Sequence, residues 1–81
     1  MTSQQFNDKY FDQLEPGFYG LAIEDTTVIN YLDEQFTEEL AVNPDFTYSQ
    51  IKLKWGNCKI YAESENTLIW EQQIDNIIRN N

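Results

Sequence analysis

Histidine is missing from the 81-residue sequence, and cysteine occurs once, as Cys58. Without histidine, the chain has neither the commonest general base nor the commonest metal ligand. A single cysteine cannot form a disulfide within the chain, and no signal peptide is evident, so we expect a protein of the reducing cytoplasm. No apolar run approaches the roughly 20 residues of a membrane-spanning helix, so we predict no membrane association.

Basic residues are also scarce: five Lys and Arg stand against 14 Asp and Glu, which gives a net charge of −9. Lys and Arg are absent between Tyr10 and Ile51. That segment contains nine acids: Asp12, Glu15, Glu24, Asp25, Asp33, Glu34, Glu38, Glu39 and Asp45. The rest of the chain has as many bases as acids, so the whole net charge belongs to one segment. This asymmetry informs on partners and solubility rather than on the fold.

A β-hairpin is predicted over residues 50–63, where two runs of alternating residues flank Gly56-Asn57. A two-residue loop that begins with Gly suits a type II′ turn, and it would place Trp55 opposite Cys58 and Lys54 opposite Lys59. Side chains alternate between the two faces of a strand. The apolar face then carries Ile51, Leu53, Trp55, Cys58, Ile60 and Ala62. The polar face carries Gln50, Lys52, Lys54, Lys59, Tyr61 and Glu63.

Three of the five basic residues therefore surround Tyr61 on the polar face, and a like-charged pair across the strands is mildly destabilising. Lysines on an exposed face or edge can simply keep a sheet soluble. The alternative is a basic and aromatic patch of Lys52, Lys54, Lys59 and Tyr61 that binds an anion, a phosphate or an acidic partner. Both interpretations stay open at this point.

Three amphipathic helices are predicted around the hairpin. The first carries Phe6, Tyr10 and Leu14, begins at a capping box with Thr2 as the N-cap, and ends before Pro16. The others cover about residues 26–41 and 67–78.

The helix over residues 26–41 has Asp25 or Thr26 as its N-cap. Glu39 falls within its apolar arc, so either the last turn frays or Glu39 lies at the margin of the core.

The order of these elements predicts one α+β domain over residues 1–81, built as two layers. Two or three helices pack on the hairpin, or on a three-stranded antiparallel sheet if residues 18–23 form a short strand beside it. The predicted core consists of Leu32, Phe36, Leu40, Ile51, Leu53, Trp55, Ile60, Trp70, Ile74, Ile77 and Ile78.

The hairpin sequence Gln50-Ile-Lys-Leu-Lys-Trp-Gly-Asn-Cys-Lys-Ile-Tyr61 resembles a family of small phage and prophage proteins, and the similarity extends over residues 26–78. The family's hairpin has the pattern Gln-aliphatic-Lys-x-Lys-aromatic-Gly-x-x-basic-aliphatic-aromatic. This chain departs from it at Leu53, where an acid is expected, and at Cys58, where an aliphatic residue is usual. The resemblance implies a phage or mobile-element context, hence the host cytoplasm, and assigns no enzymatic role.

Catalytic chemistry is not indicated by the remaining residues. Cys58 belongs to the apolar face of the hairpin, which predicts a buried, unreactive thiol. The acid pairs Asp33-Glu34 and Glu38-Glu39 could serve acid–base chemistry, but an exposed helix face explains them more simply. We therefore predict no enzyme activity, no cofactor and no metal.

These observations predict a protein that acts by binding, foremost an inhibitor of a host defence or nucleic-acid-processing protein. Its acidic face, Asp33, Glu34 and Glu38, would imitate nucleic acid and dock on a protein partner with a basic surface. Direct nucleic-acid binding is disfavoured because the net charge repels phosphates. The alternatives are an immunity-type or accessory protein, or a domain that binds an anionic ligand or partner through the hairpin face. The oligomeric state is left open.

Overall fold

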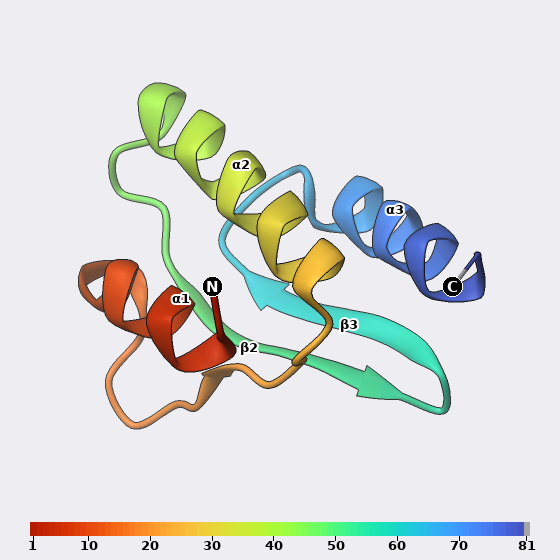
Figure 1. Cartoon of the computed structure of the whole chain (residues 1–81). Helices are drawn as coiled ribbons and strands as arrows, with labels where there is room; N and C mark the ends of the chain where they lie inside the picture. The colour runs from red at the N-terminus through yellow and green to blue at the C-terminus, as the bar shows by residue number, and fades with distance from the viewer. Residues whose placement is uncertain (81) are drawn as a thin grey trace.

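Residues 1–80 are described by the computed structural model, in which three α-helices and one short 3₁₀-helix accompany a three-stranded sheet (Figure 1). The helices are α1 (Ser3–Lys9), α2 (Thr26–Val42) and α3 (Thr67–Arg79), with the 3₁₀-helix η1 at Phe11–Gln13. The strands are β1 (Gly20–Leu21), β2 (Tyr48–Lys54) and β3 (Asn57–Ala62). The predicted two-layer α+β class is confirmed, since α2 and α3 lie over one face of the sheet (Figure 1). No helix of these residues is both long and apolar enough to cross a membrane.

The sheet has the order β1-β2-β3, so residues 18–23 do contribute a third strand. The predicted antiparallel pairing of this strand is wrong: β1 runs parallel to β2, with Gly20 beside Gln50. The reason is the connection, because the chain passes from β1 through the whole of α2 before it enters β2. Such a helical crossover returns the chain in the same direction.

The hairpin turn consists of Trp55 and Gly56, one residue earlier than predicted. Both residues have positive φ, 57° for Trp55 and 78° for Gly56, as a type I′ turn requires. The predicted opposition of Lys54 and Lys59 is therefore wrong, and Lys52 lies opposite Lys59 instead. The residue opposite each position shifts by two along the partner strand. Because the shift is even, every residue of the paired strands keeps its predicted face.

A β-bulge completes the inner face of the sheet. The register shifts between Tyr48 and Gln50, which leaves Ser49 as the extra residue. The bulge turns Tyr48 toward the helices, where it is fully buried beside Ile51. Phe36 of α2 lies at the centre of the resulting aromatic cluster, with ring centroids 4.8 to 5.7 Å from its neighbours. Those neighbours are Phe6, Tyr10, Phe46, Tyr48 and Trp70.

The core prediction fails at the far end of the hairpin. Leu53 is 45% exposed and Trp55 is 92% exposed, although both were expected inside. The physical reason is incomplete cover, because α3 packs against β3 and leaves the end of β2 and the turn exposed. The other predicted core residues are buried, except Leu40, Ile77 and Ile78, which are half-buried against the core.

The helix ends follow their local sequence. Thr2 forms the predicted capping box with Gln5, and the Asp25 carboxylate accepts a hydrogen bond from the Val28 backbone N–H. The first helix is shorter than expected, because α1 ends at Lys9 and the chain continues as η1. This end of the molecule is tied to the sheet by the backbone of Glu15, which donates to the Tyr48 carbonyl at 2.9 Å.

Candidate binding surfaces

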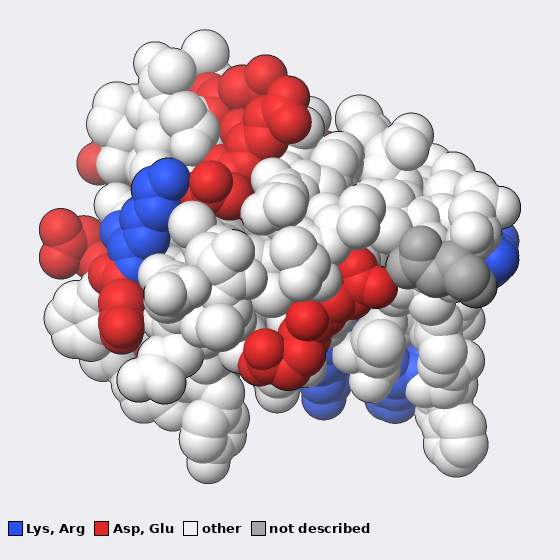
Figure 2. Space-filling model, viewed as in Figure 1, with Lys and Arg blue, Asp and Glu red and all other residues white. Residues whose placement is uncertain are grey.

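The face of the sheet that points away from the helices carries the predicted basic patch. The side chains of Lys52, Lys54, Lys59 and Tyr61 share this outer face, as the alternation of β2 and β3 requires. Lys54 and Lys59 are exposed, Lys52 is half-buried, and Tyr61 is 49% exposed. Figure 2 shows basic side chains emerging below the hairpin, on the side away from α2 and α3. The structure thus brings together all four residues predicted for this patch.

Charge within the patch is not neutralised by the protein itself. Lys52 and Lys59 lie directly opposite one another, where Cβ atoms are about 5 Å apart in an antiparallel pair. In residues 1–80 the single salt bridge joins Lys9 to Asp33, so none of the patch lysines forms a salt bridge within these residues. The opposed lysines therefore cost stability, and no salt bridge of residues 1–80 offsets that cost.

The free edge of β3 is closed by two carboxylates of α3. The Cys58 backbone N–H donates to Asp75 Oδ1 at 2.7 Å, and the Ile60 backbone N–H donates to Glu71 Oε2 at 2.8 Å. These groups would otherwise be open to pairing with a strand of another chain. The sequence signal for this arrangement is the spacing of Glu71 and Asp75, which places both carboxylates one turn apart on one side of α3. A partner can therefore reach the outer face of the sheet but not pair along β3.

The acidic residues predicted as a second surface are not equivalent. Asp33 binds Lys9 Nζ at 2.8 Å and accepts the Tyr10 hydroxyl at 2.5 Å, which ties α2 to α1. Burial acts to raise the pKa of Asp33, but the hydrogen bonds from Lys9 and Tyr10 outweigh it and leave the pKa below its ordinary value. Glu34 and Glu38 are exposed one turn apart on α2. The structure thus separates Asp33, a structural residue, from two carboxylates that face solvent.

Acidic side chains gather in several separate patches on the face shown in Figure 2, and one of these lies over α2. A nucleic-acid mimic needs carboxylates in a continuous row along one surface, because phosphates follow one another along a strand. On the face shown in Figure 2 the acidic side chains are dispersed, which gives this surface less support than the grouping of lysines gives the basic patch.

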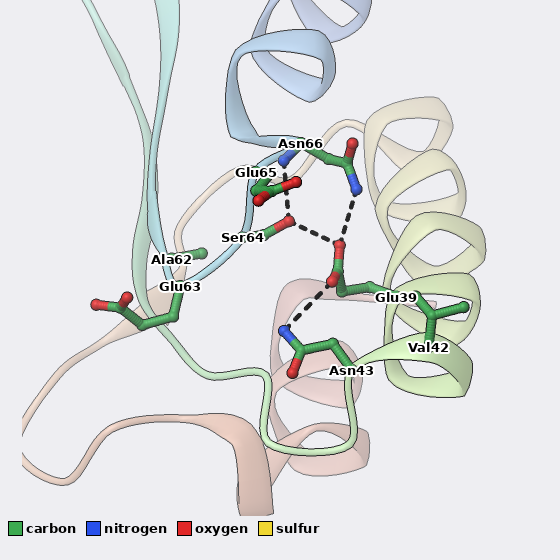
Figure 3. Close-up of a pocket in the computed structure, with 8 residues that line it drawn as sticks. All are labelled: Glu39, Val42, Asn43, Ala62, Glu63, Ser64, Glu65 and Asn66. Carbon is green, nitrogen blue, oxygen red and sulfur yellow. Dashed lines mark hydrogen bonds between the residues drawn. The ribbon is translucent and has the colours of Figure 1, made fainter.

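A polar groove of about 560 Å³ lies between the end of α2 and the loop from β3 to α3 (Figure 3). Its floor is Glu39, which is only 7% exposed. Glu39 Oε1 accepts hydrogen bonds from Ser64 Oγ at 2.7 Å and Asn66 Nδ2 at 3.0 Å, and Oε2 accepts from Asn43 Nδ2 at 3.4 Å. Glu39 thus lies at the margin of the core, the second of the two predicted alternatives.

The Glu39 carboxylate is stabilised in its ionised form. Burial acts to raise its pKa, but the hydrogen bonds from Ser64, Asn66 and Asn43 outweigh burial and hold the pKa below its ordinary value. Because both oxygens already accept hydrogen bonds from the protein, we assign Glu39 a structural role: it fastens the β3–α3 loop to α2.

Cys58 is buried, as predicted, and is 1% exposed. Burial, reinforced by the nearby carboxylates of Asp75 and Glu71, raises the pKa of the thiol to about 12. A thiol in this state has almost no thiolate at neutral pH, so it is a poor nucleophile and a poor metal ligand. Among residues 1–80, no group of three or more Cys, Asp or Glu side chains could hold a metal ion.

Comparison of the chain with protein-family models, with curated proteins and with solved structures finds no match. The resemblance of the hairpin to phage and prophage proteins therefore stays a prediction, and the function has to be argued from the two surfaces themselves.

Proposed function

We propose that this protein acts without catalysis, by binding an acidic protein partner through the outer face of its sheet. The observation that carries the proposal is the uncovered patch of Lys52, Lys54, Lys59 and Tyr61. It gathers three of the five basic residues of a chain whose net charge is −9. A fold that needed only solubility would gain nothing from opposing two of these lysines.

The chemistry of the patch favours a protein over nucleic acid as the partner. Each lysine that contacts a phosphate contributes to binding by releasing counterions, but the remaining surface of this acidic chain repels a long phosphate row. An acidic protein presents only a few carboxylates over the area of the patch. Tyr61, which is half exposed, adds an apolar contact with a hydroxyl at its end, a side chain that is common at protein interfaces.

The non-catalytic part of the proposal is supported by the absence of histidine and by the state of Cys58, whose pKa is raised to about 12. The buried carboxylate of Glu39 already accepts hydrogen bonds from Ser64 and Asn66.

Affinity capture from bacterial lysate tests the proposal. The tagged protein should retain an acidic protein, and the double variant Lys54→Glu with Lys59→Glu should lose it. The matched control is Lys54→Arg with Lys59→Arg, which keeps the charge and should keep the partner. If the charge-reversed variant captures the same protein in the same yield, the assignment of this face is wrong.

A second candidate function is an inhibitor that imitates nucleic acid. Its acidic face would consist of the exposed pair Glu34 and Glu38, without Asp33. The observation in its favour is that these carboxylates lie one turn apart on α2 and face solvent. Here Glu34→Lys with Glu38→Lys should abolish capture of a basic nuclease or another nucleic-acid-processing protein. The same change at Glu63 and Glu65, also exposed, is the control. If both variants lose capture equally, the net charge of the protein, and not this pair of carboxylates, determines binding.

A further inference from the structure

An apolar groove of about 550 Å³ lies at the end of the molecule formed by residues 11–18. Phe11 is 70% exposed and Phe18 is 52% exposed, so each presents an aromatic ring to solvent at this groove. Asp12 and Glu15 also line it and place carboxylates beside the rings. The groove therefore combines apolar walls with negative charge.

Local sequence explains why this groove is open. Pro16 and the positive φ of Gly17, 86°, form a tight turn closed by the Phe18 backbone N–H, which donates to the Glu15 carbonyl at 3.2 Å. This turn holds Phe18 at the surface. No helix of residues 1–80 packs over the turn (Figure 1).

The hairpin tip has the complementary chemistry. Trp55 is 92% exposed, the most exposed of the large apolar side chains of residues 1–80. It occupies a left-handed position, φ 57°, where Gly or Asn is ordinarily favoured and a bulky residue is strained. Lys54 directly precedes it and carries positive charge to the same tip. The tip therefore presents an aromatic ring beside a cation.

The tip and the groove lie at opposite ends of the molecule in Figure 1, where the hairpin turn is teal and residues 11–18 are orange. The longest dimension of the protein is 32 Å, so the tip of one molecule cannot enter its own groove. We propose that the protein self-associates, with Trp55 of one copy inserted between Phe11 and Phe18 of a second copy.

Charge complementarity supports a second copy as the occupant. Insertion of Trp55 would bring the Lys54 ammonium to the carboxylates of Asp12 and Glu15. Opposite charges would then be paired around a desolvated aromatic contact. Because tip and groove lie at opposite ends, two antiparallel copies related by a twofold axis form the contact twice. With three aromatic side chains in each contact, at about 150 Å² each, the pair buries on the order of 900 Å². An interface of that size belongs to weak, concentration-dependent complexes.

This inference shares Lys54 with the basic patch but does not rest on the proposed function, because its contact is made by Trp55 and the groove of residues 11–18. Sedimentation velocity from micromolar to millimolar concentration tests it. The mass of the natural chain should rise from 9.6 kDa toward twice that value. Trp55→Asn and Phe18→Asn should each weaken association at least tenfold, as expected for a central aromatic anchor. Val42→Asn is the control. Val42 is 81% exposed on α2, outside the hairpin tip and the groove, so its replacement should leave self-association unchanged.

Mixing the two variants distinguishes loss of contact from loss of structure. A mixed pair keeps one intact contact, because the Phe18→Asn copy supplies Trp55 and the Trp55→Asn copy supplies the groove. The mixture should therefore associate more strongly than either variant alone. A natural chain that stays monomeric throughout, or a Trp55→Asn variant that associates as the natural chain does, overturns the proposal.

Discussion

Glu39→Gln tests whether the buried carboxylate stabilises the fold by holding the β3–α3 loop against α2. The amide can still accept from Ser64 and Asn66, whose donors lie 2.7 and 3.0 Å from Oε1, but the charge is lost. A hydrogen bond to a charged group contributes about 1 kcal/mol more than a neutral one, so two bonds give a loss of about 2 kcal/mol in the free energy of unfolding. In a domain of this size that lowers Tm by about 10 °C.

The effect should depend on pH in a defined direction. The pKa of Glu39 is lower in the folded protein than in the unfolded chain, so its contribution is fully present above the unfolded pKa. The contribution is lost as the pH falls through the folded pKa. Urea denaturation followed by circular dichroism should therefore show a lower free energy of unfolding for Glu39→Gln than for the natural chain at pH 7. This difference should disappear in acid.

The control is Glu38→Gln, which removes the same charge from an exposed neighbour. Its free energy of unfolding should stay within about 0.5 kcal/mol of the natural value, as for most surface substitutions. The reasoning is refuted if the two variants are equally stable at pH 7, or if the gap persists unchanged in acid.

Three further predictions concern single residues. Trp55→Asn should raise the free energy of unfolding by about 1 kcal/mol, because Asn tolerates the left-handed conformation that strains Trp; a loss of stability in urea would contradict the turn geometry. Cys58 should react with a thiol reagent at neutral pH only through opening of the fold, because its pKa is raised to about 12; equal rates in the folded and urea-unfolded protein would show the thiol to be accessible. Gly20→Ala should cost about 2 kcal/mol, since φ is 74° and the new Cβ would lie 2.4 Å from Asn7 Oδ1; an unchanged Tm would disprove this packing.

Features that depend on neighbouring residues could be predicted from the sequence. The cap formed by Thr2 and the division of the hairpin into two faces were both correct, because a cap spans three residues and a strand alternates every second one. The position of the turn was wrong because a Gly-first loop was assumed. The chain instead places Trp55 at positive φ, a conformation that intrinsic preference disfavours for a bulky residue.

Features that depend on distant contacts could not be predicted. Nothing in the spacing of residues shows that Lys9 and Tyr10 engage Asp33, more than 20 positions away, and so remove it from the candidate acidic face. Ser64 and Asn66, which donate to Glu39, are equally remote in sequence, although the position of Glu39 in the apolar arc did signal that it required partners. The parallel orientation of β1 follows from the path of the chain through α2, which strand periodicity does not contain.

The central claim is that the outer face of the sheet is the binding surface, and amide NMR mapping with poly-L-glutamate as an acidic probe tests it most directly. The account predicts chemical-shift changes that centre on Lys52, Lys54, Lys59 and Tyr61 and weaken with salt. It also predicts that Lys54→Glu with Lys59→Glu abolishes the changes. Shifts confined to α2, or the same shifts in the charge-reversed variant, would contradict it.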